Sequence, residues 1–228
     1  MSNATVLVVP GFHGSGPGHW QSWLETQLPE SRRVSGIDWE EPVLADWALA
    51  IRDEIDAASG VVWIVAHSFG CLASVVAIAD RTEKVAGAIL VAPADPMRFS
   101  PLGARDLSRH ERKSSALNSV KPLLPDWPLP VMGLVVASST DPWMAQDEAH
   151  EWGRRWGFGF YDAGDAGHIN VESGHGPWPL VRNLLQSMRL AAHAFPVLGS
   201  VEGAERRRGR GSVLANVRKH TRRKIQYV

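Results

Sequence analysis

The chain has 228 residues, of which 44% are hydrophobic and 21% are charged, and this suits one compact domain with a sizeable core. Its 24 Lys and Arg equal its 24 Asp and Glu, but residues 200–228 hold nine basic and only two acidic side chains. These numbers exclude a basic surface over the whole domain, of the kind that binds nucleic acid, and predict an acidic domain at 1–199 followed by a basic tail at 200–228.

Cysteine usage and hydropathy set further limits. The single cysteine, Cys71, cannot form an intrachain disulfide. The first apolar run, TVLVV, is too short for a signal peptide, and no later run approaches the roughly 20 apolar residues of a membrane span. We therefore expect a cytoplasmic protein without a membrane span.

Short β-branched runs alternate with segments of helical periodicity along the chain. We expect strands at 5–9, 33–38, 61–66, 85–92, 131–137 and 159–161, and helices at 19–28, after Pro42, at 69–79, at 142–156 and at 180–195. This order predicts a mostly parallel sheet of about six strands with helices on both faces, an α/β fold. The only segment long enough for an insertion, 96–130, is polar at its centre, so we expect no large lid.

A strand, a sharp turn and a helix meet at Ala66-His67-Ser68-Phe69-Gly70. Small residues two before and two after Ser68 relieve the crowding of a nucleophile elbow, in which the serine side chain stands clear of the sheet. The alternative is that Ser68 only caps the following helix. We expect His67, although adjacent, to be a packed or partly exposed ring and not the base.

A serine hydroxyl needs a base to remove its proton. Of the nine histidines, His168 is favoured because it follows the last short strand, where the chain order Ser, Asp, His requires its base. His175, in the same loop, is the rival.

The imidazole in turn needs a carboxylate that fixes its tautomer. Asp141 follows the strand at 131–137 and lies between Ser68 and His168 in chain order. It could instead cap a helix that begins at Pro142, and Asp95, after the preceding strand, is the rival acid.

The loop VPGFHGSGPG after the first strand is rich in glycine but lacks the spacing of either phosphate-binding motif. It fits better as a donor loop, in which the Phe12 N–H joins the Phe69 N–H to bind an oxyanion. His13 and His19 flank the glycines as candidates for the pocket wall. Trp20, Trp143 and Trp178 are candidates for an aromatic wall, with ordinary core packing as the alternative. No motif predicts a metal site or a cofactor.

Four blocks, VVPGFHGSGPGHWQSWLE, VAHSFGCLA, SSTDPW and GDAGHINVESGHGPWP, resemble the small serine hydrolases related to retinoblastoma-binding protein 9 and bacterial YdeN. They span roughly residues 5–190. The resemblance implies a minimal α/β-hydrolase fold, the triad Ser68, Asp141 and His168, and esterase-like or amidase-like activity on small substrates without a cofactor. It covers nothing in the tail.

We therefore expect a serine hydrolase that acts through an acyl-enzyme. The alternative is a partner-binding protein on a hydrolase scaffold with weak or no catalysis. For 200–228 we expect a solvated, mostly disordered extension, with contact to nucleic acid or an anionic surface as the alternative. The sequence predicts no oligomeric state.

Overall fold

The computed structural model describes residues 4–105 and 118–194. The predicted tail at 200–228 and the centre of the 96–130 segment lie outside these residues. No helix in the described ranges is long and apolar enough to cross a membrane.

Six strands form one sheet in the order β2-β1-β3-β4-β7-β8, and every neighbouring pair is parallel. The strands are β1 (Thr5–Val9), β2 (Ser31–Arg33), β3 (Val62–His67), β4 (Val85–Val91), β7 (Met132–Ala137) and β8 (Gly159–Asp162). The predicted parallel sheet of about six strands is confirmed.

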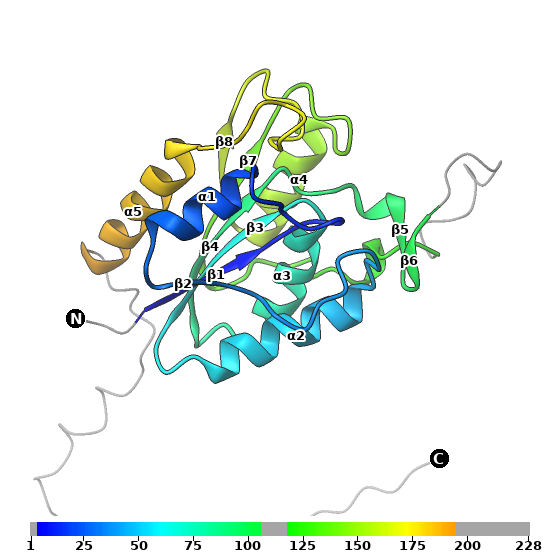
Figure 1. The fold of residues 1–228 in the computed structure, drawn as a ribbon. Helices are drawn as coiled ribbons and strands as arrows, with labels where there is room; N and C mark the ends of the chain where they lie inside the picture. The colour runs from blue at the N-terminus through cyan, green and yellow to red at the C-terminus, as the bar shows by residue number, and fades with distance from the viewer. Residues whose placement is uncertain (1–3, 106–117, 195–228) are drawn as a thin grey trace, which may run out of the picture. The chain divides into compact units, whose positions relative to one another are not determined.

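The described residues form five α-helices, of which the first four lie between strands and the last follows β8 (Figure 1). They are α1 (Trp20–Gln27), α2 (Leu44–Ala57), α3 (Phe69–Ala79), α4 (Gln146–Trp156) and α5 (Pro179–Ala194). The described part of 96–130 includes 3-10 turns at Pro96–Arg98 and Lys121–Leu123 and a small hairpin of β5 (Phe99–Ser100) and β6 (Gly103–Ala104).

Alternate side chains of each central strand enter two separate hydrophobic clusters. On β3, Ile64 and Ala66 pack in the cluster that contains the buried faces of α2, α3 and α4. Trp63 and Val65 pack in the cluster that contains residues of α1 and α5. Since successive strand residues point to opposite faces, helices cover both sides of the sheet, as the near-continuous apolar runs predict (Figure 1).

Two predicted elements have the wrong bounds. The strand expected at 33–38 lies at Ser31–Arg33, because the chain leaves the sheet after Val34 and turns at Gly36, whose φ is +72°. The helix expected from Pro142 begins only at Gln146. The Trp143 N–H donates to the Asp141 carboxylate (2.8 Å), and the chain then continues through a bend to the N-cap of α4 at Ala145.

Candidate active site

Ser68 lies in the turn between β3 and α3 with φ 54° and ψ −125°, a sparsely populated region for a residue with a side chain. Its N–H donates to the Val91 carbonyl at the end of β4 (3.0 Å). Ser68 occupies the N-cap position of α3, but its side chain makes no capping hydrogen bond. The hydroxyl is therefore available for other contacts.

The turn requires two glycines in contact with it. A Cβ at Gly70 would lie 2.2 Å from the Pro10 carbonyl oxygen, and a Cβ at Gly11 would lie 2.7 Å from the Ser68 Cβ. Both distances are far below van der Waals contact. The loop after β1 thus lies so close to the start of α3 that neither position has space for a side chain.

His168 and Asp141 complete a chain of hydrogen bonds with Ser68. The Nε2 atom of His168 lies 2.9 Å from Ser68 Oγ, and its Nδ1 atom lies 2.8 and 2.9 Å from the two carboxylate oxygens of Asp141. The side chain of Asp141 is 2% exposed and that of His168 is 9% exposed. The structure thus brings the three predicted residues together in a nearly dry environment.

Two hydroxyl residues in front of Asp141 hold the loop that carries His168. Ser138 Oγ donates to the Gly164 carbonyl (3.0 Å) and accepts from the Ala166 N–H (2.9 Å). Thr140 Oγ1 accepts from the Gly167 N–H (3.0 Å). The loops after β7 and β8 are therefore joined directly beside the imidazole–carboxylate pair.

Two aromatic side chains hold the other side of the same loop. His67 Nε2 donates to the His168 carbonyl (2.9 Å), and Trp20 Nε1 donates to the Ile169 carbonyl (2.8 Å). His67 is buried, as expected of a packed ring, and burial holds its pKa well below the usual value. The neutral ring anchors His168 from beneath.

The two predicted oxyanion donors flank the serine. Phe69 is the first residue of α3, so its N–H has no acceptor within the helix. The Phe12 N–H, in the loop that carries Gly11, makes no hydrogen bond to any described residue. Both amides are therefore free to bind a ligand.

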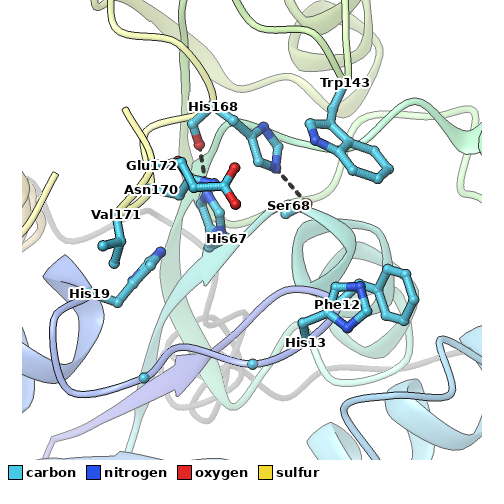
Figure 2. Close-up of a pocket in the computed structure, with 12 residues that line it drawn as sticks. Phe12, His13, His19, His67, Ser68, Trp143, His168, Asn170, Val171 and Glu172 are labelled. Carbon is cyan, nitrogen blue, oxygen red and sulfur yellow. Dashed lines mark hydrogen bonds between the residues drawn. The ribbon is translucent and has the colours of Figure 1, made fainter. Parts of the chain in front are cut away.

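A cavity of about 250 Å³ opens in front of Ser68. Figure 2 shows His168 pointing at Ser68, with Trp143 on one side and His67 and His19 on the other. The lining consists of Phe12, His13, Gly14, Gly16, His19, His67, Ser68, Trp143, His168, Asn170, Val171 and Glu172.

Of the candidate pocket residues, His13, His19 and Trp143 line this cavity, whereas Trp20 and Trp178 do not. The Trp143 ring centroid lies 5.7 Å from that of His168. Trp178 is absent from the lining among the described residues and packs edge-on against Trp20 (5.6 Å). Its position after a glycine-rich loop did not distinguish a pocket wall from a core contact.

The rival acid and base are engaged elsewhere. Asp95 caps a 3-10 turn by accepting a hydrogen bond from the Met97 N–H (2.8 Å). His175 contacts the Ser173 hydroxyl through Nδ1 (3.2 Å) and packs edge-on against Trp178. Within the described ranges, no three His, Cys, Asp or Glu side chains are grouped as ligands for a metal ion.

Several residues near the site were not singled out from the sequence. Asn170, Val171 and Glu172 line the cavity, and Ser138 and Thr140 join the two loops. The run SST before Asp141 was the available indication, because hydroxyl side chains that follow a strand commonly bond to backbone groups of a neighbouring loop.

Comparisons with known proteins identify the family of the chain. A family model described as serine hydrolase matches residues 6–187. Among solved structures, the chain is similar to a protein described as a YdeN-like hydrolase from Pectobacterium atrosepticum, with 34% identity and a TM-score of 0.70 over 82% of this chain and 91% of that one. A comparison with the curated proteins finds no match.

Two more distant structures share the fold. The ydeN gene product of B. subtilis is 18% identical, with a TM-score of 0.61 over 82% of this chain and 99% of that one. Est1E from Butyrivibrio proteoclasticus, solved with ferulic acid bound, is 15% identical, with a TM-score of 0.63 over 84% of this chain and 90% of that one. The fold is thus a minimal α/β-hydrolase fold, and the chain belongs to the serine hydrolase family as a relative of the YdeN-like hydrolases.

Proposed function

We propose that this chain hydrolyses small ester or amide substrates through a covalent acyl-enzyme on Ser68, with His168 as the base and Asp141 as the acid that orients it. The observation that carries the proposal is the continuous hydrogen-bond chain from Ser68 Oγ through the His168 imidazole to both carboxylate oxygens of Asp141. A serine used only as a helix cap would have no need of this chain.

In the acylation step, Ser68 Oγ attacks the substrate carbonyl carbon while its proton passes to His168 Nε2. The carboxylate of Asp141 accepts the Nδ1–H of His168 and stabilises the imidazolium. The imidazolium then gives its proton to the leaving alcohol or amine as the carbon–oxygen or carbon–nitrogen bond breaks. The acyl group remains on Ser68.

The negative charge that develops on the carbonyl oxygen requires donors in place before the reaction. The Phe12 and Phe69 amides fill this role, and the positive end of the α3 dipole lies on the same side. In the deacylation step, His168 removes a proton from water, the hydroxide attacks the acyl carbon, and Ser68 Oγ leaves with that proton.

The cavity favours small substrates. Its volume of about 250 Å³ lies just below the range of about 300–1,000 Å³ that is usual for small-molecule sites. One wall carries the rings of Phe12 and Trp143, which suit an apolar part of the substrate, and the other carries imidazole and amide groups.

A fluorophosphonate probe tests the nucleophile. We expect the wild-type chain to be labelled on Ser68, as located by peptide mass spectrometry, and the Ser68→Ala variant to remain unlabelled. Equal labelling of both chains, or a modified peptide elsewhere, would rule out Ser68 as the nucleophile.

The same probe distinguishes the two candidate acids. Asp141→Asn should slow labelling by on the order of 10³-fold or more, because the amide holds the imidazole in the wrong tautomer. Asp95→Asn is the matched control and should keep the wild-type rate, since Asp95 caps a 3-10 turn. Slower labelling in Asp95→Asn than in Asp141→Asn would reverse the assignment.

A further inference from the structure

Two buried imidazoles lie beside Ser68, and the proposed mechanism assigns neither of them a contact with the substrate. His19, at the start of α1, and His67, at the end of β3, both line the cavity and are each 4% exposed. Their ring centroids lie 4.9 Å apart in an edge-to-face arrangement. Figure 2 shows the His19 ring pointing from its loop toward His67 and Asn170.

The contacts of His19 fix its tautomer. Its Nδ1 atom accepts a hydrogen bond from the Gln21 N–H (3.1 Å) as the N-cap of α1, so Nδ1 carries no proton. Burial, with Arg33 nearby, lowers the His19 pKa to about 4, and the ring is neutral at pH 7. The single proton is therefore on Nε2, and this buried atom has no partner among the described residues.

The contacts of His67 leave its other ring nitrogen as an acceptor, the reverse of the free nitrogen of His19. Its Nε2 atom faces the His168 carbonyl (2.9 Å), and because a carbonyl only accepts, Nε2 carries the proton. The neutral ring then leaves a lone pair on Nδ1, for which no partner occurs in the described residues. A donor and an acceptor without partners thus belong to neighbouring rings.

A ligand group that satisfies both rings must accept from His19 and donate to His67. A carboxylate or phosphate cannot donate, and the described lining holds Glu172 but no lysine or arginine to attract an anion. A hydroxyl meets both requirements through one oxygen atom.

We propose that His19 and His67 form a hydroxyl-binding subsite, so that the preferred substrates are small esters or amides with a hydroxyl on the side of the cavity away from Trp143. This inference rests on the proposed hydrolase function and specifies its substrate class. Since His19 Nε2 is shielded from solvent in the free chain, the substrate must displace a neighbour to reach it. Binding therefore requires a movement of the cavity wall, to which the half-exposed Val171 belongs.

Two substitutions at position 19 separate the subsite from the helix cap. Asparagine is a preferred N-cap residue and keeps an acceptor near the position of Nδ1, so His19→Asn retains the cap and loses the Nε2 donor. His19→Gln loses the cap but carries an amide N–H near the position of Nε2. A merely structural role predicts a defect in His19→Gln, whereas a subsite predicts one in His19→Asn.

Two matched substrate pairs, each replacing a methyl group by a hydroxyl, report on the subsite. On the acyl side they are p-nitrophenyl 3-methylbutyrate and 3-hydroxybutyrate, and on the alcohol side propyl butyrate and 2-hydroxyethyl butyrate. For at least one pair, we expect the ratio of kcat/KM, hydroxyl over methyl, to fall about tenfold in His19→Asn and to recover in His19→Gln.

Unchanged ratios for both pairs in His19→Asn would overturn the subsite and would mean that an ordered water alone satisfies the two rings. Fluorophosphonate labelling of the same variants separates this failure from failure of the proposed function. Labelled Ser68 with unchanged ratios contradicts only the subsite, whereas unlabelled Ser68 in the wild type contradicts the hydrolase mechanism.

Discussion

Gly70, two residues after the candidate nucleophile, is the position in the elbow with the least space for a side chain. An added Cβ would lie 2.2 Å from the Pro10 carbonyl oxygen and 2.9 Å from that of Val9, and backbone atoms at the end of β1 cannot move aside without breaking the sheet. We expect Gly70→Ala to lower the free energy of unfolding by about 3 kcal/mol, as measured by urea denaturation.

Gly16 supplies the matched control for this substitution. It lies in the glycine-rich loop after β1, a Cβ added there would meet no atom within 4 Å, and its φ is not positive. Gly16→Ala should change the free energy of unfolding by less than about 0.5 kcal/mol. Equal destabilisation by the two substitutions would show that the close approach at Gly70 does not limit the fold.

The two buried histidines predict an acid-sensitive stability. An unfolded histidine takes up a proton below about pH 6.5, but folded His19 does so only near pH 4. Between these values the unfolded state binds more protons, so stability falls as the pH falls, by up to about 1.4 kcal/mol per pH unit for His19.

Urea denaturation at pH 7 and pH 4.5 measures this effect. His19→Asn retains a capping side chain and removes the titrating group, so its loss of stability between the two pH values should be smaller than that of the wild type. His67, whose pKa is also held low by burial, should account for part of the remaining loss. An identical pH dependence in both chains would contradict the lowered pKa of His19.

At the scale of elements, the site depends on the connection between the loops after β7 and β8. Thr140→Val keeps the shape of the side chain and removes the hydrogen bonds to Gly167 and Asp165. Because His168 follows Gly167 directly, we expect kcat to fall about tenfold with a smaller change in KM. Steady-state kinetics on a p-nitrophenyl ester would measure both constants.

Thr26→Val is the control for the loss of a threonine hydrogen bond elsewhere. Thr26 donates to the Trp23 carbonyl at the exposed end of α1 (2.7 Å), and the substitution should leave kcat within about twofold of the wild type. A rise in KM without a fall in kcat for Thr140→Val would mean that the loop connection shapes the cavity instead of positioning the imidazole.

The sequence was sufficient to predict most elements because their bounds coincide with changes in local pattern. The β3–α3 junction is the clearest case. Six buried strand residues end at His67, Ser68 forms the turn, and a helix of small residues begins at Phe69. The start of α4 was not predictable in the same way. The Trp143 N–H donates to the Asp141 carboxylate as it would to an N-cap, but the helix begins only after Ala145.

The candidate site also contains residues that the sequence predicts and residues that it does not. Ser68, Asp141 and His168 each follow a strand, and parallel strands bring such positions to one edge of the sheet. The subsite of His19 and His67 depends instead on which imidazole nitrogen each backbone group occupies. Periodicity and spacing carry no information on this, so the donor of His19 and the acceptor of His67 could be recognised only from the structure.

At the scale of the whole molecule, the excess of positive charge and the proposed active site lie in different parts of the chain. Residues 1–199 hold 15 basic and 22 acidic side chains, whereas 200–228 hold nine and two. Every proposed catalytic and subsite residue, from Phe12 to His168, falls within the acidic part, as does the family match at 6–187. The neutral total of the chain therefore does not describe the surroundings of the site.

A chain truncated after Gly199 tests this separation. We expect it to react with the fluorophosphonate at the wild-type rate, because the residues that hold Ser68, His168 and Asp141 belong to the sheet and its loops. Removal of seven net positive charges should increase retention on an anion exchanger and abolish salt-sensitive retention on heparin. Loss of labelling without loss of folding, as judged by circular dichroism, would assign the tail a part in the site. Undiminished heparin retention would instead place the anion-binding surface on the acidic domain.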